Sequence, residues 1–165
     1  MPTPHRIAQV EQHVLQRAHR SVERLLDRLE ATAALTAALP ADALAAALDR
    51  LLDEAARTLR PHIEWEEQVC FPDTERVAGA AWATRLLRLQ HAELGVAVDR
   101  LAADRAELAR QAIAPARVAA HVYALHALLA SHLEQEERVI LGLLLELPDP
   151  PQPGACGDED PPEPA

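Results

Sequence analysis

The sequence predicts an all-α protein, an antiparallel up-down-up-down four-helix bundle. Its 165 residues suit a single domain with one core. Aromatic residues make up only 2%, so that core must consist mainly of aliphatic side chains on strong helix formers. The 13 prolines lie almost entirely outside four long segments of helical periodicity. Four such segments with short connections favour a bundle in which neighbouring helices run in opposite directions.

The first two helices are predicted on either side of Pro40. The first spans about residues 6–38, and Asp42 is expected to cap the second. The second helix should end at Phe71-Pro72, with a kink at Pro61 because proline removes one backbone hydrogen bond. The apolar stripe of the first helix comprises Val10, Val14, Val22, Leu25, Leu26 and Leu29.

The third and fourth helices are predicted over about residues 81–111 and 116–147, with Pro115 in the first turn of the fourth. We expect residues 1–147 to form one domain and residues 148–165 to be a disordered, acidic, proline-rich tail. The residues of the third helix predicted to face inward are Leu86, Leu87, Leu94, Val98, Leu101 and Leu108.

Charge and hydropathy exclude several classes of protein. The net charge is −10, and arginines alternate with acids along every segment, so no basic stripe for nucleic acid is predicted. No run of about 18 apolar residues could span a membrane, and the first residues do not resemble a secretory signal, so a cytoplasmic protein is expected. Cys70 and Cys156 are too few for a disulfide framework or a cysteine-based zinc site.

Four histidines lie near the middle of the four predicted helices: His19, His62, His91 and His132. His19 and His91 are 91 − 19 = 72 positions apart, and His62 and His132 are 132 − 62 = 70 positions apart. The two helical hairpins are therefore expected to be approximate copies related by a pseudo-twofold axis. One imidazole from each helix would then enter the space between the hairpins.

Carboxylates follow three of these histidines by four residues, as Glu23, Glu66 and Glu136. Residues at this spacing share a helix face. Imidazole with carboxylate and no thiolate favours iron or manganese over structural zinc. Surface ion pairs are the alternative, but the repeated HIEWEE and HLEQEE segments favour a metal site.

The segment HIEWEEQVCFP, residues 62–72, resembles the HxxxEExxxFP pattern of the hemerythrin and HHE cation-binding family. HLEQEERVI, residues 132–140, is similar to the corresponding fourth-helix pattern, and the resemblance extends over about residues 6–147. It implies two non-haem iron ions bridged by Glu66 and Glu136 and by an oxo or hydroxo group. His19 and His91 would take the single-histidine roles of the first and third helices.

The sequence departs from the oxygen-carrying hemerythrins at Gly95. Those proteins have a second histidine there, one turn after the first on the third helix. Glu23 is our candidate for a seventh ligand. His121 is the other, although its distance along the helix makes it better suited to an outer contact or an access path. The alternative, an ordinary core or surface histidine, is the more common case. The remaining histidines, His5, His13 and His126, are interpreted as surface residues.

The predicted function is the binding or sensing of dioxygen or iron by the di-iron pair. Two alternatives stay open: a di-iron redox enzyme acting on peroxide, nitric oxide or oxygen, and a helical module whose metal only stabilises the fold. Whether the protein is an enzyme and which proteins it contacts are left open. The side chains expected to supply apolar surroundings are Val22, Leu25, Ile63, Leu94, Leu129 and Leu133.

Overall fold

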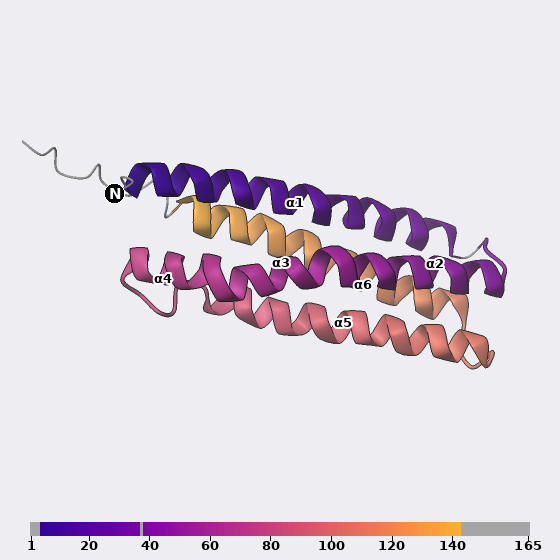
Figure 1. The fold of residues 1–165 in the computed structure, drawn as a ribbon. Coiled ribbons are helices and arrows are strands. Elements are labelled where there is room, and N and C mark those ends of the chain that lie inside the picture. The colour runs from indigo at the N-terminus through magenta and orange to yellow at the C-terminus, as the bar shows by residue number, and fades with distance from the viewer. Residues whose placement is uncertain (1–3, 37, 143–165) are drawn as a thin grey trace, which may run out of the picture.

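The computed structural model describes residues 4–36 and 38–142, and the side chains of residues 19–36, 38–140 and 142. In this part of the chain, four helical rods lie side by side and alternate in direction (Figure 1). The predicted all-α bundle is therefore confirmed. Three of the rods are α1 (Pro4–Leu35), α5 (Arg85–Ala109) and α6 (Pro115–Glu136). The α6 rod continues into the π-helical turn η3 (Glu137–Leu141).

The remaining rod is one continuous helix with two widened turns. In Figure 1 its parts follow one another along a common line. They are α2 (Ala41–Glu54), the π turn η1 (Ala55–Leu59), α3 (Arg60–Trp65), the π turn η2 (Glu66–Cys70) and α4 (Phe71–Ala78).

The two π turns precede the two prolines of this rod. The N–H of Arg60 donates to Ala55 O, just before Pro61, and the N–H of Phe71 donates to Glu66 O, just before Pro72. A proline lacks an N–H and crowds the carbonyl four residues earlier, and a wider turn accommodates both effects. The helix consequently passes through both prolines, so the predicted end at Phe71-Pro72 is wrong. It ends at Gly79, whose φ of 62° is left-handed.

Three smaller expectations also differ from the structure. Pro40 occupies the N-cap position of α2 without any side-chain hydrogen bond, and Asp42 lies in the first turn instead. The third rod begins at Arg85 rather than at residue 81, and Leu86 is 57% exposed because it lies on the outer face of α5. The predicted end of the fourth helix, the tail and Cys156 lie outside the described residues, as do the side chains of His5 and His13.

The core consists of two apolar clusters that lie on either side of a polar layer. The larger cluster contains Leu59, Leu94 and Leu133 together with most of the buried leucines. The smaller one contains Phe71, Leu87 and Ile140, with Trp65, Cys70 and Val139 packed against it. Along three of the rods, the residues of the polar layer lie between a residue of the larger cluster and a residue of the smaller one. The polar side chains are therefore enclosed by apolar surface. Within the described residues, no helix is both long and apolar enough to cross a membrane.

Candidate metal centre

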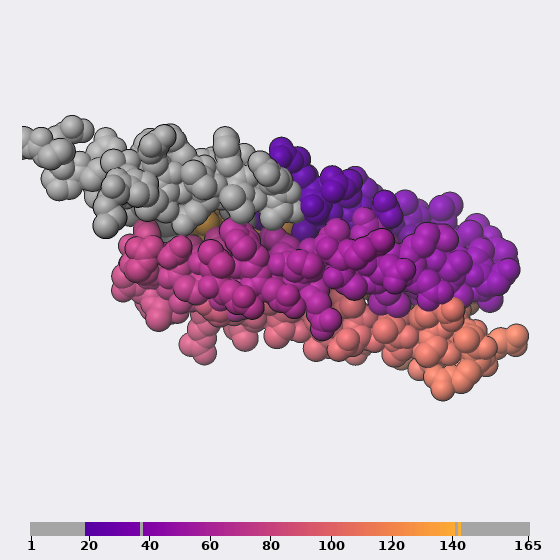
Figure 2. Space-filling view, viewed as in Figure 1, coloured from indigo at the N-terminus to yellow at the C-terminus, as the bar shows by residue number. Residues whose placement is uncertain are grey.

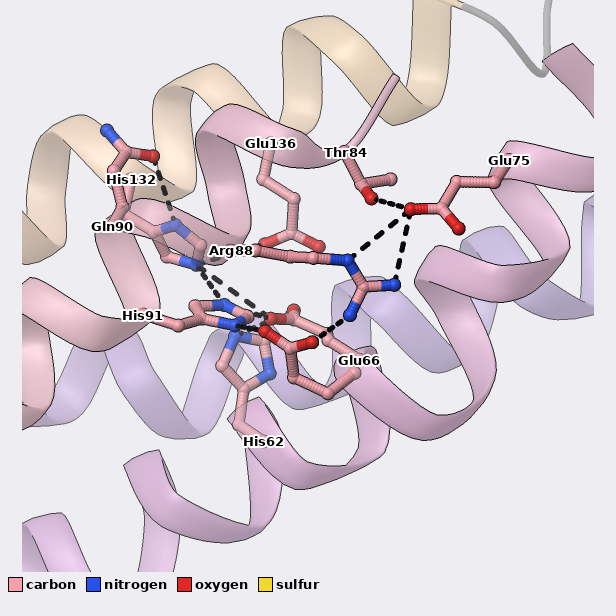
Figure 3. Close-up of polar contacts among 10 residues, drawn as sticks. His62, Glu66, Glu75, Thr84, Arg88, Gln90, His91, His132 and Glu136 are labelled. Carbon is pink, nitrogen blue, oxygen red and sulfur yellow. Dashed lines mark hydrogen bonds and ion pairs between the residues drawn. The ribbon is translucent and has the colours of Figure 1, made fainter. Parts of the chain in front are cut away.

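All four histidines predicted from the sequence enter this buried layer. His19, His62, His91 and His132 come from α1, α3, α5 and α6 and are each buried. Glu66 and Glu136 lie among them with no exposed surface. Figure 3 shows the side chains of His62, Glu66, His91 and His132 pointing toward one another. The structure thus brings together six of the seven predicted ligands.

The first group of possible ligands contains four residues: His19, His62, Glu66 and Glu136. One ligand atom from each lies within 4.8 Å of all the others. Nε2 of His19 is 3.0 Å from Oε2 of Glu136, and Nε2 of His62 is 2.9 Å from Oε1 of Glu66. This set combines two imidazoles with two carboxylates around one position.

The second group contains Glu66, His91 and His132, again with ligand atoms within 4.8 Å of one another. Oε2 of Glu66 lies 3.0 Å from Nε2 of His91 and 3.8 Å from Nε2 of His132. Glu66 is therefore shared by both groups, one oxygen directed to each. Oε2 of Glu136 also lies 3.7 Å from Nε2 of His132, so a second carboxylate extends toward this group.

Several contacts in the layer do not have the geometry of ordinary hydrogen bonds. Both oxygens of Glu66, Nε2 of His62 and Oε1 of Glu136 are buried without a hydrogen-bond partner. Nε2 of His91 faces Nε2 of His132 at 3.3 Å. Buried polar atoms without partners are costly, and two facing imidazole nitrogens need a proton or a cation between them. The donor set therefore fits a metal ion better than a purely structural polar network.

Outer partners fix the orientation of three of the four rings. The Nδ1 atom of His91 lies 2.8 Å from Oε1 of Glu67, and that of His19 lies 3.4 Å from Oε1 of Glu137. Nδ1 of His132 lies 3.3 Å from the amide oxygen of Gln90. When Nδ1 carries the proton and donates it outward, Nε2 presents its lone pair inward, as a metal ligand must.

Sequence reasoning assigned no role to these outer partners. Glu67 and Glu137 are the last glutamates of HIEWEE and HLEQEE, so the repetition of this segment is the one sequence feature that could have indicated a role for them. Each one contacts the histidine on the first helix of the opposite hairpin, since Glu67 contacts His91 and Glu137 contacts His19. Gln90 has no signal in the sequence, because its contact depends on how α5 packs against α6.

His91 is also held by an aromatic ring and by a chain of charged side chains. The Phe71 ring stacks on the His91 ring at 5.2 Å and an interplanar angle of 13°. The guanidinium of Arg88 lies 5.2 Å from the centre of the same Phe71 ring, donates to Glu67 and lies 3.2 Å from Oε1 of Glu75. Figure 3 shows Arg88 between the buried layer and Glu75, which in turn accepts a hydrogen bond from Thr84.

The two central carboxyl groups have opposite pKa shifts. Burial tends to raise the pKa of Glu66, but contacts with His132, His62 and His91 outweigh burial and lower it. Burial raises the pKa of Glu136 to about 8, and the negative charge of Glu66 adds to the rise although His19 opposes it. A metal ion between the two carboxylates would supply positive charge that lets both be ionised near neutral pH.

The histidines respond to the same surroundings. Burial tends to lower the pKa of His19 and of His91, but their contacts with Glu136 and Glu66 outweigh it, so both pKa values are raised. The pKa of His132 is lowered, chiefly because it is buried. Protons and metal ions therefore compete for the same atoms in this layer.

The remaining predicted residues lie elsewhere. Glu23, the candidate seventh ligand, is exposed and belongs to neither group, so the structure does not place it beside the other six. Glu23 lies roughly 100° around the α1 helix from the centre of its buried stripe, so it does not face the core. The stripe comprises Val22, Leu25, Leu29 and Ala33. His121 lies 2.6 Å from Asp104 through its Nδ1 atom, away from the six ligands. His126 is half-buried rather than a surface residue.

Four helices that bring buried imidazoles and carboxylates into one interior layer define a metal-binding helical bundle. The chain matches the family model of the hemerythrin HHE cation binding domain over residues 10–144 and belongs to that family. The resemblance carried by HIEWEEQVCFP is thereby confirmed. Comparisons with curated proteins and with solved structures gave no significant match. A metal cofactor is thus supported by both the family and the ligand groups.

Proposed function

We propose that this protein holds two non-haem iron ions, bridged by Glu66 and Glu136 with an oxo or hydroxo group, and binds or senses dioxygen or iron. The observation that supports this most directly is that Glu66 belongs to both ligand groups. A carboxylate with one oxygen toward each of two positions suits a pair of ions rather than one.

The choice of iron depends on the chemistry of the ligands. Imidazole and carboxylate without thiolate suit iron, whereas a structural zinc site would be expected to close around a single ion with four ligands. Bound ferrous iron would supply an electron-rich centre for oxygen. This chain's own contribution is a dry enclosure, because Val22, Leu25, Leu94 and Leu129 are buried in the adjoining core.

Metal analysis of the purified protein tests the proposal first. We expect about two irons per chain, since the two groups share one carboxylate. One zinc per chain would contradict it. Stopped-flow absorbance of the reduced protein mixed with oxygen then tests the ligand, and a long-lived oxygen-dependent band is expected for a carrier or sensor.

A di-iron redox enzyme is the second candidate function. It is favoured by the second group, which contains three residues where the first contains four. Transient absorbance accompanied by turnover of peroxide, nitric oxide or oxygen would support the enzyme over the sensor. If neither band forms and chelation leaves helicity unchanged, only a structural role for the metal remains.

A further inference from the structure

A groove of about 450 Å³ lies between the second helical rod and α5 and extends inward to His91. These two rods face the viewer in Figure 2, magenta above salmon. Its volume lies within the usual range for sites that bind small organic molecules. His91 is the one member of the two ligand groups that lines the groove.

The space in this groove results from small residues on both sides. Ala55 and Ala56 line one wall within the π turn η1, and Gly95 lies on α5. A Cβ atom at Gly95 would meet no heavy atom within 4 Å. The absence of a side chain at Gly95 therefore leaves open space beside His91.

The groove reaches the second ligand group through His91. That group contains Glu66, His91 and His132, whereas the first group contains four residues. Gly95 follows His91 by one turn, so a side chain there would lie on the same face of α5. A molecule in the groove would occupy the position from which an additional donor could approach this group.

The lining indicates which molecules the groove accepts. Its walls are mainly aliphatic, formed by Leu52, Leu59, Ile63, Leu94 and Val98. The charged residues that line it are Arg60, Glu64 and Asp99, and Arg60 lies 3.9 Å from Glu64. Because Arg60 and Glu64 balance each other, Asp99 gives the lining a net negative charge, which disfavours the binding of anions.

We propose that this groove binds a small, uncharged organic molecule whose apolar body contacts the aliphatic walls and whose single nitrogen or oxygen donor is directed at the second ligand group. This inference depends on the proposed metal centre. It adds a site for an organic ligand on the His91 side, distinct from the binding of dioxygen or iron itself.

Anaerobic calorimetry measures the binding of 4-phenylimidazole to the metal-loaded protein. This probe combines an apolar ring with one azole donor. Gly95→Leu fills the groove with a side chain. Ala92→Leu adds the same side chain at an exposed position of the same helix and is the matched control. Metal content is determined on every sample, and each titration is repeated after chelation.

We expect Gly95→Leu to weaken binding by about tenfold or more and Ala92→Leu to leave it within about twofold of the unsubstituted protein. Chelation should also weaken binding, because the donor loses the ion that it approaches. Equal binding by Gly95→Leu, or no binding by a protein that holds its metal, would overturn the inference while leaving the proposed function intact. Binding that is unaffected by chelation would show that the groove does not serve the metal centre. A protein that takes up no metal would overturn both.

Discussion

The carboxylate of Glu67 holds the ring of His91 from outside the ligand layer, with 2.8 Å between Oε1 and Nδ1. The other carboxylate oxygen of Glu67 accepts from Arg88, so His91 is connected to a charged network that reaches Glu75 and Thr84. Outer contacts of this kind fix the tautomer of a metal-binding histidine and increase the basicity of its inner nitrogen.

Glu67→Ala should therefore lower metal affinity by about 10–100-fold without replacing any ligand. Chelator competition measures the change. Glu64→Ala, which removes a carboxylate 60% exposed on the same helix, is the control and should leave the affinity unaffected. Equal losses in the two variants would mean that general surface charge, rather than orientation of His91, determines the affinity.

Glu66→Ala is expected to remove most of both metal ions, because Glu66 belongs to both ligand groups. His62→Ala and Glu136→Ala should likewise each cost most of the iron. Metal analysis after purification checks this prediction. Glu23→Ala and His126→Ala are the controls, since neither residue belongs to a ligand group, and both variants should retain their metal. Full metal content in Glu66→Ala would exclude the shared carboxylate.

Stabilisation by metal should increase as the pH rises from about 6 toward 8. The pKa of Glu136 is raised to about 8, and those of His19 and His91 are raised as well, so at low pH a metal ion must displace protons from these groups. The same raised pKa values stabilise the metal-free fold at low pH, and this contribution is lost as the pH rises through them.

The measurement is the difference in Tm between metal-loaded and chelated protein across this pH range. Glu66 does not reverse the trend, because its lowered pKa keeps it ionised throughout. A difference that shrinks as the pH rises would be inconsistent with proton displacement from Glu136 and the two histidines.

Phe71→Ala should destabilise the protein by about 3–5 kcal/mol, the usual cost of removing a fully buried phenylalanine. It should also weaken metal binding, because the Phe71 ring stacks on His91. Urea unfolding of the chelated protein gives the first effect and chelator competition the second. Val69→Ala removes a side chain that is 47% exposed, and it should change neither quantity appreciably.

The clustering of the six candidate ligands could be predicted because part of their pattern is local. His62 and Glu66, like His132 and Glu136, are separated by about one helical turn, and the spacing alone places each pair on one face. The same spacing does not bring Glu23 into the buried layer that contains His19. The inward face of α1 lies to the other side of His19, and the ring of His19 contacts glutamates of the opposite hairpin instead.

Features that depend on packing between helices could not be predicted in this way. The contacts of Glu67 with His91 and of Gln90 with His132 join different helices. The turns before Pro61 and Pro72 were also missed, because a proline in a helical pattern is normally taken as an end or a kink. Here each widened turn lets the rod continue, and the stretch between the prolines carries His62 and Glu66.

The histidine on the first helix of each hairpin is held by a pair of glutamates from the other hairpin: His19 by Glu136 and Glu137, His91 by Glu66 and Glu67. This exchange makes the two halves of the chain mutually dependent. If the hairpins separate, both ligand groups come apart at the same moment. Release of bound cations should accordingly be a concerted event, and a single hairpin would need a second copy of itself to assemble such a centre.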